Sequence, residues 1–392
     1  MSHDHPNALR RALLGGALAT PFIGWPAARA AGLQGGKGQK ILVVLEMSGG
    51  NDGLNTVVPY ADAEYYTLRQ RIGIARDQVL QLDAQAGLHP SLQPLMALWQ
   101  NRELAVVQSV GYPSANLSHF RSIEIWDTAS KSDQYLSEGW LTRAFAGAPV
   151  PRSYAADGVV LGSNEMGPLA GGGTRALALN NTAEFLRQAK LAGSDGVARN
   201  AALSHILKVE RDVTQAASNL GNNVTLRSEF PNHAFGNAVK TAAQVVASGA
   251  GIAAIKVTLN GFDTHSGQQG TQQRLLKELA EGLVAFRTAM QELGRWDNTL
   301  MMTYCEFGRR PRENMSGGTD HGTANAHFVT GGKVRGGIYG LAPALNRLDG
   351  NGNLPFAVDF RELYATALGR WWGLDTQAAL NGRFSPVDLL RA

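Results

Sequence analysis

Apolar runs that end in polar, glycine-containing stretches are the sequence feature that most constrains the fold. The first is ILVVLE at residues 41–46, which is followed directly by SGGNDG. Further runs are LAVVQSVG at 104–111, IAAIKVTLNG at 252–261, TLMMTYCEFG at 299–308 and the shorter HFVTGG at 327–332. Unbroken apolar runs of this kind are typical of parallel strands that are covered on both faces. They therefore predict a central sheet with helices on both sides.

Helical patterns alternate with these runs. The sequence predicts helices over 88–103, where Pro90 fits the first turn, and over 118–130, 268–294 and 359–373. The stretch 182–249 is rich in alanine and carries no chemical motif, so we interpret it as a helical insertion. The expected fold is an α/β doubly wound, mainly parallel sheet over residues 40–375, followed by a C-terminal tail at 376–392.

The N-terminal 30 residues have the features of a twin-arginine-type signal peptide. Arg10 and Arg11 precede the apolar run LLGGALATPFIGW, and AARAA then supplies small residues for cleavage after Ala30. The run is short and interrupted by Pro21, so we expect no stable membrane span here or elsewhere. The prediction is a periplasmic or secreted protein exported by the twin-arginine route, with an ordinary secretory signal as the alternative.

Composition narrows the classes of partner. Of 392 residues, 44% are hydrophobic and 17% charged, which is typical of a globular protein. Cys305 is the single cysteine and excludes an intrachain disulfide. The formal net charge is +4, but without residues 1–30 the chain has 33 basic and 31 acidic side chains. We therefore expect no nucleic-acid partner.

Side chains that bind metals or catalyse reactions gather next to the predicted strands. In an open α/β sheet, ligands bind beyond the carboxyl ends of the strands, so these side chains are expected to converge. Carboxylates and neutral imidazoles bind zinc, and carboxylates also suit manganese, magnesium and calcium. The candidate ligands of divalent metal ions, most favourably zinc, are Asp52, Asp263, His265, Glu306, Asp320, His321 and His327.

Two further residues are candidates for catalysis. Ser118 stands at the start of the helix 118–130, where the helix dipole and a nearby cation would stabilise its alkoxide as a nucleophile. Arg309 would hold a small anionic ester substrate through two hydrogen bonds. Each residue also has a structural explanation when taken alone: Asp52 as turn chemistry, Asp263 as a helix cap, and Ser118 as an N-cap.

The motifs, taken in order, resemble a known family. SGGNDGLNTVVPY, GLHPSL, SHF, GWL, GFDTH, EFGRR and GTDHGT resemble the exported domain-of-unknown-function family 1501, which is grouped with alkaline-phosphatase-like and sulfatase-like proteins. The resemblance covers about residues 40–375 and implies an alkaline-phosphatase-like fold with two metal ions at the carboxyl ends of the sheet.

The resemblance also implies roles for single residues. Asp52 resembles the early aspartate, and Asp320 with His321 resembles the late Asp-His pair, which together hold one ion. Asp263 and His265 are similar to ligands of the other ion, although D-x-H replaces the usual D-x-x-x-H. His327 would supply a remaining histidine and Ser118 the nucleophile. Cys305 stands where the family commonly has serine, and we interpret it as structural or as supporting a ligand from behind.

Three functions remain open at this point. The first is a metal-dependent hydrolase of phosphate or sulfate esters that uses Ser118 as its nucleophile. The second is a non-catalytic exported binding or assembly protein with a vestigial site, for which 182–249 would be the surface that meets a protein partner. The third is a serine esterase, because GGND at 49–52 resembles the oxyanion block of such enzymes.

Overall fold

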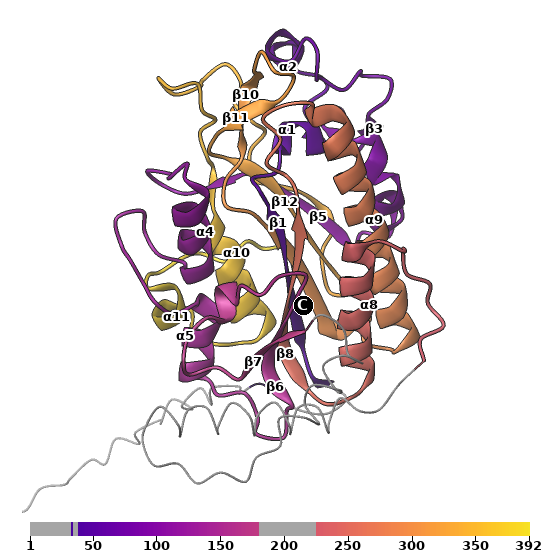
Figure 1. Ribbon diagram of the computed structural model, residues 1–392, viewed down its shortest axis with the longest axis vertical. Coiled ribbons are helices and arrows are strands. Elements are labelled where there is room, and N and C mark those ends of the chain that lie inside the picture. The colour runs from indigo at the N-terminus through magenta and orange to yellow at the C-terminus, as the bar shows by residue number, and fades with distance from the viewer. Residues whose placement is uncertain (1–32, 34–37, 180–224) are drawn as a thin grey trace, which may run out of the picture.

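The computed structural model describes residue 33 and residues 38–179 and 225–392 (Figure 1). The signal peptide expected at 1–30 and residues 182–224 of the expected insertion lie outside the described residues.

A mainly parallel sheet forms the centre of the molecule. Its strand order is β13-β5-β12-β9-β1-β8-β6-β7, and β14 pairs with β5 beside it. Only β12 runs antiparallel to its neighbours, β5 and β9. All other pairs are parallel, as the apolar runs predicted. For the run 327–332, which forms β12, the expectation of a parallel strand was wrong. The strands are β1 (Ile41–Ser48), β5 (Leu104–Gly111), β6 (Ala156–Leu161), β7 (Ala176–Leu179), β8 (Ile252–Asn260), β9 (Thr299–Tyr304), β12 (Asn325–Gly331), β13 (Gly337–Tyr339) and β14 (Val358–Asp359).

Helices cover both faces of this sheet, which confirms the predicted fold class (Figure 1). One face packs against α8 (Ala234–Ala247) and α9 (Gln268–Glu292), with side chains such as Phe235 and Leu276 in the core. The other packs against α4 (His119–Thr128), α5 (Trp140–Gly147) and α10 (Phe360–Ala365), where Trp126 stacks on Phe360. Two separate apolar cores therefore hold the central strands in place.

Some helices differ from the sequence expectation. Residues 88–103 form the 3-10 helix η2 (Pro90–Leu95) and then α3 (Met96–Gln100), because Pro94 lacks the N–H that an α-helical turn needs. The helix expected over 359–373 is α10 followed by the π-helix η5 (Thr366–Trp371). Helix α8 falls within 182–249, yet it packs against α9 and β8 as part of the layer that covers the sheet.

The C-terminal segment packs on the body of the protein. It contains α11 (Gln377–Leu380), and Leu389 is completely buried. Short 3-10 helices are η3 (Gly167–Leu169) and η4 (Trp296–Asn298). Within the ranges that the structure describes, no helix has the length and apolar character needed to cross a membrane.

Small elements gather at the end of the sheet where β1 and β8 finish, at the top of Figure 1. They are α1 (Gly53–Thr56), α2 (Ala63–Leu68), the strands β2 (Val57–Val58), β3 (Leu80–Gln81) and β4 (Gly87–Leu88), and the hairpin of β10 (Arg309–Glu313) and β11 (Thr319–His321). Loops from distant parts of the sequence therefore meet beyond the carboxyl ends of the central strands.

Candidate metal centre

The loops after β1 and β8 lie against each other and place Asp263. The backbone N–H of Phe262 donates to the carbonyl of Ser48 at 3.0 Å. Gly49 has a φ of +114°, and a Cβ at this position would come within 2.4 Å of the backbone nitrogen of Asp263. Glycine is required here because only a residue without a side chain allows both the conformation and the close approach.

His119, the first residue of α4, points one ring nitrogen at a buried carboxylate. Its Nδ1 lies 2.8 Å from Oε1 of Glu306, which also accepts the N–H of Gly49 at 2.9 Å. Because a carboxylate only accepts, Nδ1 of His119 carries the hydrogen. This hydrogen bond with Glu306 raises the pKa of His119 above its ordinary value. Its other ring nitrogen, Nε2, has no hydrogen-bond partner.

His321, the last residue of β11, is oriented in the same way by a carbonyl. Its Nδ1 donates to the backbone oxygen of Leu117 at 2.8 Å, so in the neutral ring Nε2 carries a lone pair. Burial lowers the pKa of His321 and favours this neutral form. Its ring centroid lies 4.4 Å from that of His119 and 4.4 Å from that of Phe307, which is buried beneath both rings.

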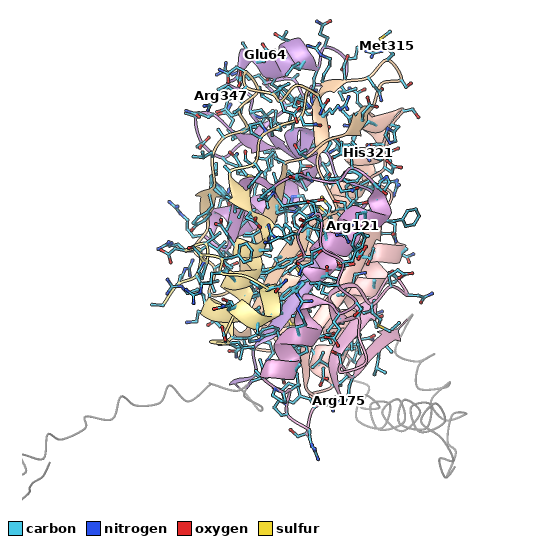
Figure 2. All side chains as sticks on the ribbon, turned by 90° about the vertical axis from the view of Figure 1, so that its left-hand side faces the viewer. Glu64, Arg121, Arg175, Met315, His321 and Arg347 are labelled. Atoms are coloured by element: carbon cyan, nitrogen blue, oxygen red, sulfur yellow. The ribbon has the colours of Figure 1, made fainter. Side chains whose placement is uncertain are left out.

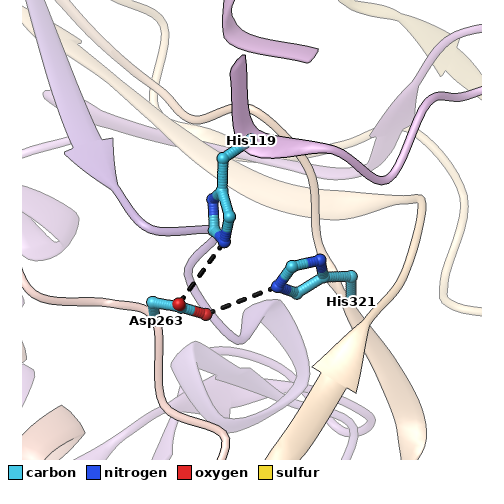
Figure 3. A group of neighbouring side chains, drawn as sticks. All are labelled: His119, Asp263 and His321. Carbon is cyan, nitrogen blue, oxygen red and sulfur yellow. Dashed lines mark hydrogen bonds and ion pairs between the residues drawn. The ribbon is translucent and has the colours of Figure 1, made fainter. Parts of the chain in front are cut away.

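Asp263 joins the two histidines (Figure 3). Its Oδ2 lies 3.4 Å from Nε2 of His119, and its Oδ1 lies 3.4 Å from Nε2 of His321. Burial tends to raise the pKa of Asp263, but the hydrogen bond and charge of Arg309 outweigh it, together with His119 and His265, and lower that pKa. The side chain is 48% exposed, so an ion from solvent can reach the ionised carboxylate.

His265 and Asp320 extend the cluster towards solvent. The Nε2 of His265 lies 3.1 Å from Oδ1 of Asp263 and 2.9 Å from Nε2 of His321. The Nδ1 of His265 lies 3.6 Å from Oδ1 of Asp320. Asp320 thus stands behind His265, whereas Nε2 of His265 faces the other ligand atoms.

The donor set fits a divalent cation. Ligand atoms of His119, Asp263 and His321 all lie within 4.8 Å of one another. Each histidine donates its other ring N–H to an oxygen, which is how proteins orient metal-ligating imidazoles. Imidazole nitrogens together with one carboxylate are preferred by zinc. Nε2 of His119 makes no hydrogen bond and lies 3.4 Å from the carboxylate of Asp263, so its lone pair is placed to bind a cation.

Arg309 does not have the role that the sequence suggested. Its buried guanidinium donates from Nε to Gly50 O at 2.7 Å, from Nη1 to Thr319 O at 3.0 Å and from Nη2 to Asp263 Oδ1 at 2.7 Å. Nη2 also contacts the carbonyls of Gly49 and Phe262. With its donors directed at the protein, the side chain ties three loops together and orients Asp263 and does not offer two hydrogen bonds to a substrate.

Two predicted ligands lie outside the cluster. Asp52 is 1% exposed and accepts hydrogen bonds as the N-cap of α1, while its other oxygen is paired with Arg69. His327 is completely buried in β12 beside Trp126, and burial lowers its pKa to about 3. His327 is therefore a neutral core histidine. Asp52 has a structural role, as the residue that caps the turn into α1.

Glu306 and Asp320 were also expected as ligands. Their carboxylates instead lie next to the Nδ1 atoms of His119 and His265, on the side of each ring away from the cluster. Ser118 is exposed, precedes His119 directly and makes no side-chain cap hydrogen bond to α4. Cys305 is buried and structural: its Sγ lies 2.8 Å from Nδ2 of Asn325, and burial raises the pKa of the thiol.

Reasoning from the sequence missed His119 as a candidate ligand. The motif SHF and its place at a helix start drew attention to Ser118, although the imidazole next to it is the group that enters the cluster. The sequence did contain a signal for His119, because it follows the strand β5 in the chain just as Asp263 follows the strand β8. The partner that fixes its ring, Glu306, lies 187 residues away and could not be paired with it from the sequence.

The centre opens on the face of the molecule that α4 covers. Figure 2 shows His321 on this face, between Met315 above and Arg121 below. Phe120, the residue after His119, is 89% exposed, and Met315 is 91% exposed. With Asp263 48% and His265 45% exposed, the cluster itself is accessible to solvent.

Comparison with known families gives one match over most of the chain. Residues 39–382 match the model of the protein family of unknown function DUF1501. The chain belongs to this family. Among curated proteins, none matches the sequence.

Solved structures with a similar arrangement belong to alkaline phosphatases, sulfatases and their relatives. PsFucS1 sulfatase from Pseudoalteromonas sp. is 13% identical, with 89% of this chain and 70% of that chain covered and a TM-score of 0.44. The C-terminal periplasmic domain of EcEptC from Escherichia coli in complex with Zn is 10% identical, with 75% and 73% covered and a TM-score of 0.38. TAB5 alkaline phosphatase with bound Mg is 13% identical, with 76% and 93% covered and a TM-score of 0.33. Because these scores lie below 0.5, the function proposed next rests on the site itself.

Proposed function

We propose that this DUF1501 protein is an exported, metal-dependent hydrolase of phosphate or sulfate esters. The observation that carries the proposal is the convergence of the Nε2 atoms of His119 and His321 on the carboxylate of Asp263. The DUF1501 membership itself prescribes no activity, so the chemistry is inferred from these side chains.

His119, Asp263 and His321 would hold the ion, and His265 is placed to be a fourth ligand because its Nε2 faces the same atoms. A divalent cation bound here would act as a Lewis acid towards the anionic group of an ester. Zinc matches the imidazole-rich donor set best, and manganese, magnesium or calcium are alternatives that a metal titration separates.

Ser118 is the proposed nucleophile. It lies next to the ligand His119 at the start of α4, a helix of 10 residues, and its exposed side chain does not cap the helix. The N-terminus of the helix favours negative charge, which would stabilise the serine alkoxide. Phe307, which is buried, packs against both histidine rings and would close that side of the site to water.

Export is the second part of the proposal. Arg10 and Arg11 with the following apolar run support a signal peptide, and a twin-arginine route would deliver the folded chain to the periplasm.

Purified protein that is loaded with zinc, manganese or calcium and assayed with aryl phosphates, phosphodiesters and aryl sulfates tests the activity. We expect turnover with one of these ester classes that a chelator abolishes. Ser118→Ala should lower kcat by roughly 10³-fold or more while metal binding stays intact. The matched control is Ser137→Ala, an exposed serine between α4 and α5 that should retain full activity.

Metal binding without hydrolysis of any of these esters would refute the hydrolase and support the binding or assembly protein. The serine esterase receives no support from Asn51, because this side chain is completely buried and its Nδ2 donates to Thr56 Oγ1 at 2.9 Å. An oxyanion donor must instead face the substrate. Labelling of Ser118 by a fluorophosphonate in metal-free protein would restore that alternative.

A further inference from the structure

The buried ion pair of Asp52 and Arg69 bears on how many metal ions the protein binds. We propose that the guanidinium of Arg69 takes the place of a second cation at Asp52, so that the chain binds a single divalent ion, at His119, Asp263 and His321. This inference rests on the proposed function and deepens it, because it defines the centre as mononuclear.

Both oxygens of Asp52 are already used. Oδ1 accepts the backbone N–H groups of Leu54 at 3.1 Å and Asn55 at 3.4 Å. Oδ2 accepts hydrogen bonds from Nη1 of Arg69 and from Nε2 of Gln268. A carboxylate has about four acceptor positions, and these four donors occupy them.

Arg69 is fixed in this position by further hydrogen bonds. Its Nε donates to the carbonyl of Pro311 at 2.8 Å, and Nη2 donates to the carbonyl of Arg310 at 3.2 Å. Nη1 also donates to Oδ1 of Asn55 at 2.7 Å. The side chain is completely buried, so these contacts anchor the guanidinium to β10 and solvent does not compete for it.

Two glutamines of α9 complete the surroundings of Asp52. Gln272 donates to the backbone carbonyl of Asp52 at 2.9 Å, and Gln268 donates to Oε1 of Gln272 at 3.2 Å. Oε1 of Gln268 in turn accepts the hydroxyl of Thr319 at 2.6 Å. Asp52 is thus enclosed by amide and guanidinium donors, none of which can bind a cation through the hydrogen that it donates.

The surroundings of Asp52 differ from the metal centre in their charge balance. The carboxylate of Asp52 and the guanidinium of Arg69 are both buried and neutralise each other. A divalent ion would have to expel Arg69, which would leave a guanidinium buried without its partner, and such unpaired buried charges are strongly unfavourable. The cluster at Asp263 instead offers exposed ligand atoms and the unpartnered Nε2 of His119.

Metal stoichiometry of the intact wild-type protein tests the inference. Protein stripped with a chelator is titrated with zinc chloride by calorimetry, and the ion content is measured after desalting. We expect about one zinc ion per chain. Two ions per chain would overturn the single-ion inference but leave the proposed function standing, whereas no bound ion would overturn both.

A paired variant tests the part played by Asp52. Because Asp52→Asn alone would leave Arg69 unpaired, the double variant D52N/R69M removes both charges together. It should bind one zinc ion with a Kd within about twofold of wild type. The matched control is E313Q/R71M, which removes a partly exposed pair at 2.9 Å, with Arg71 51% and Glu313 11% exposed. Loss of the ion in D52N/R69M but not in the control, with both proteins folded by circular dichroism, would show that Asp52 is a ligand.

Discussion

The Nε2 atom of His265 lies 2.9 Å from the Nε2 atom of His321. Since Nδ1 of His321 donates to Leu117 O at 2.8 Å, its Nε2 accepts, and the hydrogen between the two rings belongs to His265. For His265 to act as a ligand through Nε2, that hydrogen must move to its Nδ1. Oδ1 of Asp320 lies 3.6 Å from Nδ1, and its negative charge would stabilise the hydrogen on that nitrogen.

Removal of Asp320 is therefore expected to weaken metal binding through His265. Asp320→Ala should raise the Kd for zinc by ~10–100-fold, the range typical of groups that orient a ligand. Asp320→Asn keeps an oxygen acceptor and should recover most of the affinity. Calorimetric titration of the three proteins measures this, and equal affinities for wild type and Asp320→Ala would contradict the role assigned to Asp320.

Glu306 should control both the charge and the orientation of His119. Its hydrogen bond with Nδ1 raises the pKa of His119, so Glu306→Gln is expected to lower that pKa in metal-free protein. NMR titration of the imidazole measures the shift. The same variant should bind zinc ~10–100-fold more weakly, since the ring loses its charged partner. A pKa of His119 unchanged by Glu306→Gln would refute the assignment.

His327 should make the protein less stable at acidic pH. Burial lowers its folded-state pKa from 6.5 to about 3, so only the unfolded chain takes up this proton between these values. The contribution of His327 to the free energy of unfolding is therefore fully present above pH 6.5 and falls as the pH is lowered towards 3. Between pH 7 and pH 5 this single group accounts for about 2 kcal/mol.

The variant His327→Asn removes this titration. Denaturant unfolding at pH 7 and pH 5 should show a smaller loss of stability for the variant than for wild type, by about 2 kcal/mol. Other histidines titrate equally in both proteins and cancel in the comparison. An identical pH dependence for the two would mean that His327 is protonated in the folded state.

Lys256 should stabilise the sheet by balancing buried acids. Its Nζ lies 2.7 Å from Oε2 of Glu46, and both side chains are buried. Asp127 lies near them, and burial raises its pKa to about 8 against the opposing charge of Lys256. Lys256→Met is expected to lower the free energy of unfolding by about 3–5 kcal/mol, because Glu46 loses its counter-charge.

The double variant E46Q/K256M should recover part of this loss, since it removes the unpaired charge. Lys277→Met, which breaks the exposed pair with Glu281 on α9, is the control and should change stability by less than about 1 kcal/mol. Chemical denaturation of all variants provides the measurement. If Lys256→Met and Lys277→Met behaved alike, the buried pair would not have the role proposed here.

The sequence determined the sheet and the location of the centre. Runs such as 41–46 and 252–261 are apolar at most of the positions that a doubly covered strand buries, with Glu46 and Lys256 as buried charged exceptions, so their identity as strands required no knowledge of partners. Polar residues after such strands meet at one edge by topology alone, which is why Asp263 and His321 could be expected together. The physical reason is that hydrophobic periodicity and strand direction are local properties of the chain.

Only the tertiary structure decided which carboxylates are ligands. Asp52 and Asp263 follow neighbouring strands in the same way, yet Asp52 is buried against Arg69 and Asp263 is half exposed among histidines. The pairing of His119 with Glu306 likewise joins residues 187 positions apart. Whether a charged group meets a counter-ion or solvent depends on packing between distant segments, and no local pattern in the sequence specifies it.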